Sequence, residues 1–188
     1  VNDEGIDGLV INTREMDKIS LGDNAGEIVA QAGASLTRTA LFSLENGLSG
    51  LEFSHGIPGS VGGAVCMNAG AYGGEMKDVV KSVRVYNPST GQVENIAGED
   101  MEFSYRHSIV REKKLVVLAV TLKLKRGNSD DIKNVMDELA AKRREKQPLE
   151  YPSAGSTFKR PKGHFAGQLI EEAGLKGFRI GGACVSPK

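Results

Sequence analysis

The sequence contains no tryptophan and only two cysteines among its 188 residues. Cys66 and Cys184 lie far apart and form no CxxC pair, so we expect a reducing compartment and neither a disulfide framework nor a zinc cluster. Net charge is missing too, since 24 Lys and Arg balance 24 Asp and Glu. Because general nucleic-acid and membrane-surface binders usually carry a basic excess, this balance argues against both classes.

Long apolar runs are also absent. The longest run, Leu115–Val120, has six residues, whereas a transmembrane helix needs about 20. No signal peptide opens the chain, and we expect a cytoplasmic protein with no obligate protein partner. The first residue is Val1 rather than an initiator Met, which suggests a segment taken from the interior of a longer protein. The three histidines, His55, His107 and His164, show no metal-ligand spacing, so no metal is assigned.

Glycine, in contrast, is abundant and clustered. Seven of the 24 glycines fall between Gly56 and Gly74, in a stretch that reads HGIPGSVGGA and then NAGAYGG. The spacing is neither the G-x-G-x-x-G of a Rossmann turn nor a Walker loop. Glycines let backbone N–H groups approach a ligand and form a nest for anionic oxygens, to which Ser60 could add a hydroxyl and a helix beginning at Val61 its N-terminus. Composition alone does not separate this nest from a tightly packed loop without a ligand.

The apolar patterns predict a mixture of strands and helices. Alternation and turn chemistry predict strands at Leu9–Ile11, Met16–Leu21, Glu27–Ala32, Val79–Tyr86, Gln92–Ala97 and Leu115–Leu124. Two helices are expected, one capped by Ser35 and stopped at Asn46-Gly47, the other capped by Ser129 and ended by Pro148. Strands with interspersed helices and no βαβ rhythm predict an α+β domain over residues 1–147. Residues 148–188 are rich in loops and have too few apolar positions for a core of their own.

Two short motifs carry candidate chemistry. Arg106, in Tyr105-Arg106-His107-Ser108, precedes the strongest predicted strand and is well placed to clamp a carboxylate, although a plain surface arginine is the commoner case. Ser156 lies in Ala-Gly-Ser-Thr-Phe-Lys, where a serine is usually turn chemistry and where no G-x-S-x-G elbow exists. Between residues 142 and 162, seven basic side chains outnumber two acidic ones, which fits either a solvated helix end or a patch for an anionic ligand.

The glycine-rich string together with the Tyr-Arg-x-Ser and Ala-Gly-Ser motifs resembles the UDP-N-acetylenolpyruvoylglucosamine reductase family, over essentially the whole chain. That resemblance implies an FAD-binding fold of the vanillyl-alcohol-oxidase (PCMH) type over residues 1–147, without its N-terminal subdomain, and the start of a substrate-binding domain at 148–188. It also implies a set of cofactor-binding residues: His55, Gly56, Ile57, Pro58, Gly59, Ser60, Gly62, Gly63, Asn68, Gly70, Ala71, Tyr72 and Val117.

The activity implied by the resemblance is reduction of the enolpyruvyl group of UDP-N-acetylglucosamine enolpyruvate to UDP-N-acetylmuramate, with FAD as cofactor and NADPH as hydride donor, in peptidoglycan precursor synthesis. Arg106 matches the residue that polarises the substrate, and Ser156 matches the serine that donates a proton. Tyr105, Lys159 and Arg160 are expected to contact the UDP-sugar. Arg160 stands where some members carry Asn, which weakens that one expectation.

Parts of the family pattern are not in this sequence. A flavin loop of the form Gly-Asn-Gly-Ser-Asn is expected to precede Val1, and a catalytic Glu to follow Lys188, so the chain by itself is expected to be inactive. No long tyrosine-bearing loop fits between Arg106 and Ser156, which resembles the subgroup that lacks it. Two alternatives stay open: another FAD-dependent oxidoreductase of the same fold, such as an oxidase, and a non-catalytic nucleotide-binding module.

Overall fold

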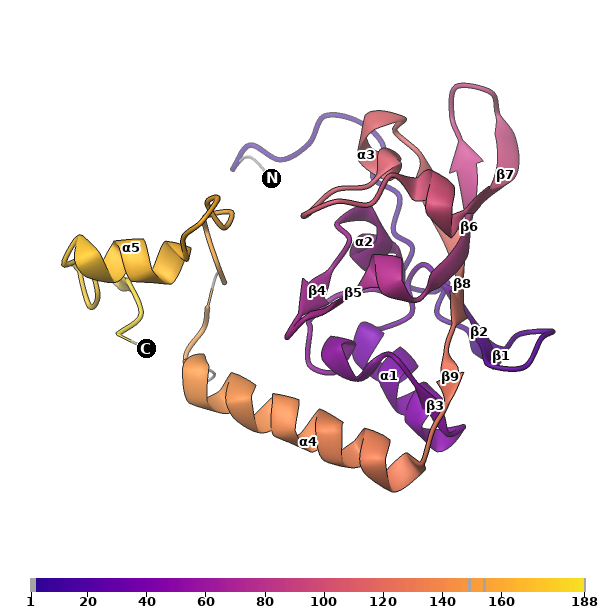
Figure 1. Ribbon diagram of the computed structural model, residues 1–188. Coiled ribbons are helices and arrows are strands. Elements are labelled where there is room, and N and C mark those ends of the chain that lie inside the picture. Colours follow the sequence, from indigo (N-terminus) through magenta and orange to yellow (C-terminus); the bar gives the residue numbers. More distant parts are fainter. Residues whose placement is uncertain (1–2, 149, 154, 188) are drawn as a thin grey trace. The chain divides into compact units, whose positions relative to one another are not determined.

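A computed structural model describes residues 3–148, 150–153 and 155–187 (Figure 1). The chain divides into two compact units, Val1–Leu139 and Ala140–Lys188. The boundary expected between the FAD-binding and substrate-binding domains, at residues 147 and 148, stays a prediction.

The regular elements of the first unit are mostly short. Its helices and 3₁₀ turns are α1 (Leu36–Glu45), η1 (Glu52–Ser54), α2 (Val61–Cys66), η2 (Met76–Asp78), η3 (Gly98–Met101), α3 (Ile109–Glu112) and the first part of α4 (Ser129–Lys146). Its strands are β1 (Ile19–Leu21), β2 (Glu27–Gln31), β3 (Leu48–Ser49), β4 (Gly70–Ala71), β5 (Gly74–Glu75), β6 (Val80–Asn87), β7 (Gln92–Ala97), β8 (Val116–Lys123) and β9 (Lys125–Arg126).

A five-stranded antiparallel sheet organises this unit, with the order β1-β2-β8-β6-β7. Its register pairs Val120 with both Ala30 and Val83, and all three side chains are buried. Helices α1 and α2 lie on the same side of the sheet (Figure 1). Their apolar residues, including Leu36 and Val61, join the core that the sheet begins. The predicted α+β class is therefore confirmed.

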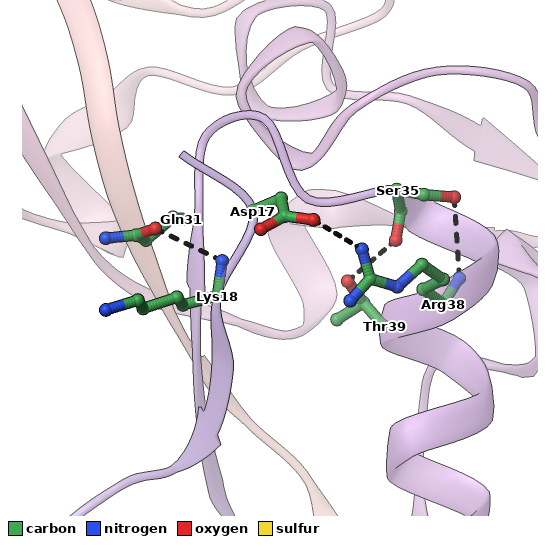
Figure 2. A network of polar contacts seen from close by, with 6 residues as sticks. All are labelled: Asp17, Lys18, Gln31, Ser35, Arg38 and Thr39. Carbon is green, nitrogen blue, oxygen red and sulfur yellow. Dashed lines mark hydrogen bonds and ion pairs between the residues drawn. The ribbon is translucent and has the colours of Figure 1, made fainter. Parts of the chain in front are cut away.

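Helix α1 begins where the sequence predicts, and Figure 2 shows why it is held there. The hydroxyl of Ser35 accepts from the N–H of Arg38 at 3.5 Å, and Thr39 donates its own hydroxyl to the Ser35 carbonyl at 2.9 Å. Arg38 also pairs with Asp17 at 2.7 Å, which ties the helix to the segment that leads into β1. The predicted stop at Asn46-Gly47 is confirmed, because Gly47 has a φ of 61° that suits a left-handed helix end.

Five of the six predicted strands are present, four of them within one residue of their expected ends, while β1 begins at Ile19 rather than Met16. The exception is Leu9–Ile11, which forms no strand and whose side chains are exposed, so this prediction was wrong. A three-residue apolar run has a strand's composition, but a strand also needs a ladder partner, and none of the described strands pairs with it.

Two details of the predicted elements also differ. Regular alternation over the predicted strand Val79–Tyr86 would place Lys81 on the same face as Val83 and Val85, but irregular register at Val80/Ser82 turns Lys81 to solvent. The cap of α4 falls one residue earlier than expected, because the side chain of Asn128 accepts from the N–H groups of Asp130 and Asp131 at 2.7 and 3.3 Å. Both shifts are local and leave the buried stripe of the helix, Ile132 and Met136, in the core.

The second unit contains the end of α4, helix α5 (Ala166–Glu172) and a hairpin of β10 (Arg179–Ile180) with β11 (Ala183–Cys184). None of its described residues is fully buried, which agrees with its low apolar content. Among the residues the structure describes, no helix combines the length and the hydropathy needed to span a membrane.

Candidate functional site

The glycine-rich segment forms a loop that leads from η1 into α2. Ser60 caps α2, and its hydroxyl accepts from the N–H of Gly63 at 3.3 Å. The N–H groups of Val61 and Gly62 donate to carbonyls of Ala34 and Ala32, at 2.8 and 2.9 Å. The first amides of this short helix are therefore already bonded within the chain. The amides left to donate lie instead in the loop before it, where those of Gly59 and Ser60 have no acceptor among the described residues.

The glycines of this loop serve two different needs. A Cβ on Gly62 would lie 3.0 Å from the Cβ of Ala32 and 3.1 Å from its carbonyl oxygen, so Gly62 allows α2 to pack on the end of β2. Gly59 has a φ of 142°, and a Cβ there would meet nothing within 4 Å. Glycine is favoured at this position by the backbone conformation, because no packed neighbour would exclude a larger side chain. Gly59 and the exposed Gly63 thus border the surface on which a ligand could approach the backbone.

His55 sits at the start of the loop with an unusual polar atom. Its Nδ1 is buried and has no hydrogen-bond partner within the described chain. A buried polar atom without a partner is costly, and most such atoms in proteins are bonded to something. The orphaned Nδ1, the free loop amides and the open glycine positions are together the features that a bound dinucleotide would satisfy, so the residues present fit FAD.

The segment after α2 folds back as a two-strand hairpin, β4–β5, with Tyr72 and Gly73 at its tip. Tyr72 has a φ of 53° and Gly73 one of 90°, the left-handed pair that a two-residue hairpin of type I′ requires. Tyrosine rarely adopts this conformation, and its side chain is exposed here. The tip therefore presents an aromatic ring beside the glycine-rich segment, at the cost of some backbone strain.

Arg106 lies in a second tight turn, closed by reciprocal backbone hydrogen bonds of 3.2 Å between Ser104 and His107. Its φ is 56°, again a conformation that costs a side-chain-bearing residue about 1 kcal/mol. Its guanidinium lies 5.1 Å from the ring centroid of Tyr105, within cation–π range. It also donates through Nη2 to the carbonyl oxygen of Gly70 at 3.3 Å.

Three hydrogen bonds join this turn and the adjoining Ser108 to the end of α2 and the segment that follows it. The first is the bond from Arg106 to Gly70, the second runs from the Asn68 amide to the Ser104 carbonyl at 3.1 Å, and the third from the Ser108 hydroxyl to the Cys66 carbonyl at 2.9 Å. The structure therefore brings together two motifs that lie about 40 residues apart in the sequence. A guanidinium fixed beside a glycine-rich loop forms a site that suits an anionic substrate next to a nucleotide cofactor.

The other predicted residues of the first unit occupy varied positions. Ile57 and Ala71 are half-buried, Pro58 and Gly56 are exposed, and Tyr105 is about half exposed. Val117 is different, because its side chain is 7% exposed and belongs to the core, paired with Val85 across β6 and β8. A cofactor contact at that position is limited to its backbone.

Ser156, Lys159 and Arg160 lie in the second unit, on an irregular segment with exposed side chains. Arg160 stacks over the ring of Phe165, with 3.9 Å between its Cζ and the ring centroid. Ala154, which precedes the candidate serine motif, lies outside the described residues. The roles predicted for these three residues stay predictions.

Charged groups around the site are mostly paired. Glu75 accepts from Asn68 at 2.6 Å and pairs with Lys77, which raises the pKa of the lysine above its usual value. Burial raises the pKa of the Cys66 thiol, an effect that Arg111 partly opposes. A thiol held in its neutral form is a poorer nucleophile than a thiolate, so this shift disfavours nucleophilic chemistry at Cys66.

Among the described residues, neither a metal-binding cluster nor the surface hollow described next coincides with this site. Within the described ranges, no group of three or more His, Cys, Asp and Glu side chains could hold a metal ion. A surface hollow of about 190 Å³ does occur, at the β1–β2 turn. It is lined by residues such as Asn24, Asn46 and Arg126, and none of the predicted site residues contributes to it.

Sequence reasoning missed three residues that hold the site together. Ser108 was visible as part of the Tyr-Arg-x-Ser motif, but its fully buried hydroxyl marks it as a tie to α2 rather than a ligand contact. Glu75 and Ser104 had no sequence signal, because their partners are set by a fold-back that local patterns do not encode.

The fold and this loop define a flavin-binding class of protein, and comparison with known families agrees. A family profile described as FAD binding domain matches residues 1–97, just over half of the 188 residues, and the chain belongs to that family. A second profile, described as UDP-N-acetylenolpyruvoylglucosamine reductase, C-terminal domain, matches residues 147–188.

The narrower family follows from individual relatives. UDP-N-acetylenolpyruvoylglucosamine reductase of Lactobacillus acidophilus is 54% identical over all 188 residues, and that of Caldanaerobacter subterraneus subsp. tengcongensis is 50% identical. The chain spans 62% and 61% of these two proteins. A crystal structure of the reductase from Thermus caldophilus superposes with a TM-score of 0.76 at 40% identity, covering 84% of this chain and 57% of the other. The chain is thus similar over its whole length to proteins named UDP-N-acetylenolpyruvoylglucosamine reductase, which confirms the resemblance seen in its motifs.

Proposed function

We propose that the protein carrying this chain is an NADPH- and FAD-dependent reductase of UDP-N-acetylglucosamine enolpyruvate. It forms UDP-N-acetylmuramate for peptidoglycan synthesis and works in the cytoplasm. The observation that carries the proposal is the contact of Arg106 with Gly70, which fixes a cation against the glycine-rich segment. The 54% identity with a reductase of that name supports the choice of substrate. The proposed reaction needs no nucleic acid, membrane or protein partner.

The glycine-rich loop is the part that holds the cofactor. The free amides of Gly59 and Ser60 are donors for the diphosphate, and the buried Nδ1 of His55 gains a partner when the site is filled. When bound, FAD supplies hydride-transfer chemistry, with NADPH as the source of the hydride. Tyr72, at the exposed hairpin tip, offers an aromatic face to the same ligand. The other residues from Gly56 to Ala71 that are predicted to contact the cofactor lie in this loop or follow it.

Arg106 acts on the substrate. Its guanidinium can hold the carboxylate of the enolpyruvyl group through two parallel hydrogen bonds and stabilise the negative charge that develops there during reduction. The turn that carries it is already formed and bonded to Cys66, Asn68 and Gly70, so little reorganisation is needed when the substrate binds. The neighbouring Tyr105 is half exposed and is available to line the substrate.

Ser156 is the proposed proton donor, through its hydroxyl to the carbon next to the carboxylate. An unperturbed hydroxyl is a weak acid, so this role needs a strongly basic carbon and nearby positive charge. Lys159 lies three residues further along the chain and is a candidate source of that charge. Lys159 and Arg160 also suit the diphosphate of a UDP-sugar, and we assign residues 148–188 to the substrate domain and 1–147 to the FAD domain.

The proposal is tested with a version of the chain lengthened at both ends to the full length of its relatives, called here the extended protein. We expect NADPH oxidation that depends on UDP-N-acetylglucosamine enolpyruvate and yields UDP-N-acetylmuramate by mass spectrometry. Arg106→Ala is expected to lower kcat by about 10²- to 10³-fold, the range for losing one preorganised charge donor. Oxygen-dependent oxidation of an alcohol or sugar without NADPH, and no product from the UDP-sugar, would point to an oxidase of the same fold instead.

A further inference from the structure

The side chain of Asn68, near the site, makes three hydrogen bonds within the chain. It is 0% exposed, and its amide nitrogen donates to the Glu75 carboxylate at 2.6 Å and to the Ser104 carbonyl at 3.1 Å. Its amide oxygen accepts from the N–H of Lys77 at 2.9 Å. The backbone at this residue has a φ of 40°, which asparagine tolerates better than most residues do.

This arrangement requires an amide rather than a carboxylate. The nitrogen faces two acceptors, Glu75 and Ser104, so an oxygen in its place would face two other oxygens. Asp would keep the size, the backbone preference and the acceptor for Lys77, yet it would reverse the polarity on the other side. The exchange therefore removes the donor function of the side chain and also brings a negative charge beside Glu75.

The contact with Ser104 links Asn68 to the candidate catalytic turn. The carbonyl of Ser104 accepts from Asn68 and also from the N–H of His107, which closes the turn that contains Arg106. Arg106 in turn reaches back to Gly70, two residues beyond Asn68. The turn is thus held at its base by Asn68 and at its tip by the arginine, while the strained φ of 56° at Arg106 favours its opening.

We propose that Asn68 is a positioning residue for Arg106: it holds the turn of residues 104–107 in place through the Ser104 carbonyl and has no direct part in flavin binding. This inference rests on the proposed function for the role of Arg106, but the ordering of the turn stands without it. It differs from the expectation that Asn68 contacts the cofactor. Its amide nitrogen donates two hydrogen bonds and its amide oxygen accepts one, all within the chain.

The first test follows the turn itself and needs no activity. In the 188-residue chain, hydrogen exchange of the Ser104 and His107 amides is measured by NMR for the wild type and for Asn68→Asp. We expect both amides to exchange about tenfold faster in the variant, while Val83 and Val120 in the central sheet keep their rates. Unchanged rates at Ser104 and His107, or an equal rise at all four amides, would overturn the proposal.

The second test is a double-mutant cycle in the extended protein. Asn68→Asp is expected to lower kcat about 30- to 100-fold, the scale of a small misplacement of a catalytic group, and to leave the FAD dissociation constant within about threefold. In the Arg106→Ala background the same change should have no further effect on kcat, because Asn68 acts through that arginine. Independent, multiplying effects, or a tenfold weaker FAD affinity, would contradict the positioning role.

Two further variants keep the test decisive. If Asn68→Asp does not fold, Asn68→Gly removes the amide but suits the φ of 40°, and the same outcomes apply to it. Ser43→Ala is the matched control for lost stability, since it removes a buried hydroxyl that bonds to Ala40 in α1, outside the site. Its kcat should equal that of the wild type. If Arg106→Ala leaves turnover intact, the proposed function of the arginine fails, and the exchange test still decides whether Asn68 orders the turn.

Discussion

The guanidinium of Arg106 donates to the carbonyl oxygen of Gly70 across 3.3 Å, although 36 residues separate the two in the chain. Through this contact the cation of one motif lies against the glycine-rich segment of the other. Arg106 holds a left-handed backbone conformation to make it, where a glycine would be free of strain. Strain of this kind is kept where function needs a particular side chain at that place.

A substitution can separate the hydrogen-bonding geometry of the Arg106 guanidinium from its positive charge. Arg106→Lys keeps the charge but loses the planar fork that pairs with a carboxylate through two hydrogen bonds. We expect kcat/KM of the extended protein for the UDP-sugar to fall by about 100-fold. Arg111→Lys, an exposed position in α3, is the matched control and should keep the wild-type value. Equal activity of both variants would show that Arg106 is only a surface cation.

The neighbouring glycines Gly62 and Gly63 are expected to respond differently to the same change. Gly62→Ala forces a Cβ to 3.0 Å from that of Ala32, so the free energy of unfolding should fall by about 1–3 kcal/mol in urea titrations. At Gly63 the nearest atom to a new Cβ is the Ser60 hydroxyl at 3.5 Å, and alanine there should fold at least as stably. Because its Cβ enters the ligand surface, Gly63→Ala should weaken FAD binding about tenfold or more, measured by flavin fluorescence. Wild-type FAD affinity in this variant would place the cofactor elsewhere.

Ser108 is predicted to matter for stability. Its buried hydroxyl donates to the Cys66 carbonyl at the end of α2, and Ser108→Ala leaves that acceptor without its partner. The expected loss is about 1–3 kcal/mol in the free energy of unfolding. Chemical denaturation of the 188-residue chain measures it directly. A variant as stable as the wild type would mean that water replaces the bond without cost.

A pH dependence is expected from Glu27, a nearly buried carboxylate on β2. Its hydrogen bond from Lys81 and a second one from Asn24 lower the pKa of Glu27 below 4.5 in the folded chain. The unfolded chain therefore binds this proton at higher pH, so the stabilisation is complete above about pH 4.5 and is lost as the pH falls through the folded pKa.

Glu27→Gln and Lys81→Met should each flatten the loss of stability below pH 4.5, because either change removes one partner of the pair. Thermal melts at pH 3.5 to 7 compare the two variants with the wild type. Acid sensitivity that stays the same in both variants would assign it to other carboxylates.

Lys114 provides a test of backbone strain away from the site. It follows α3 with a φ of 51°, the position where helices favour glycine. Lys114→Gly should therefore raise the free energy of unfolding by about 0.5–1 kcal/mol. Turnover should not change, since Lys114 makes no contact with the described site residues. A destabilised variant would show that the lysine side chain, rather than the backbone, is what matters at this position.

Local signals in the sequence predicted much of the fold. Ser35 and Gly47 bound α1 as expected, because capping and left-handed stops depend on neighbouring residues. The hairpin of β6 and β7 was equally visible from its Asn-Pro-Ser-Thr-Gly turn. Leu9–Ile11 failed because a strand is defined by its partner, and the bulge near Lys81 was missed because register is set between strands.

The sequence predicted both motifs of the candidate site but not that they lie next to each other in the fold. Arg106 and the glycine-rich loop could be named from residue type and family resemblance, whereas the ties through Asn68 and Ser108 depend on how α2 and the 104–108 turn pack. Those ties join residues far apart in sequence, and a single sequence carries no periodicity that reports them. Ser156 remains a prediction on the same motif grounds.

The most direct test of the whole account is whether the glycine-rich loop binds FAD. FAD is titrated into the 188-residue chain and into the extended protein, and absorbance at the flavin bands is read after gel filtration. We expect the extended protein to retain one FAD per chain and Gly63→Ala in it to weaken this retention. An extended protein that elutes without flavin would contradict the assignment of this loop and, with it, the proposed reductase.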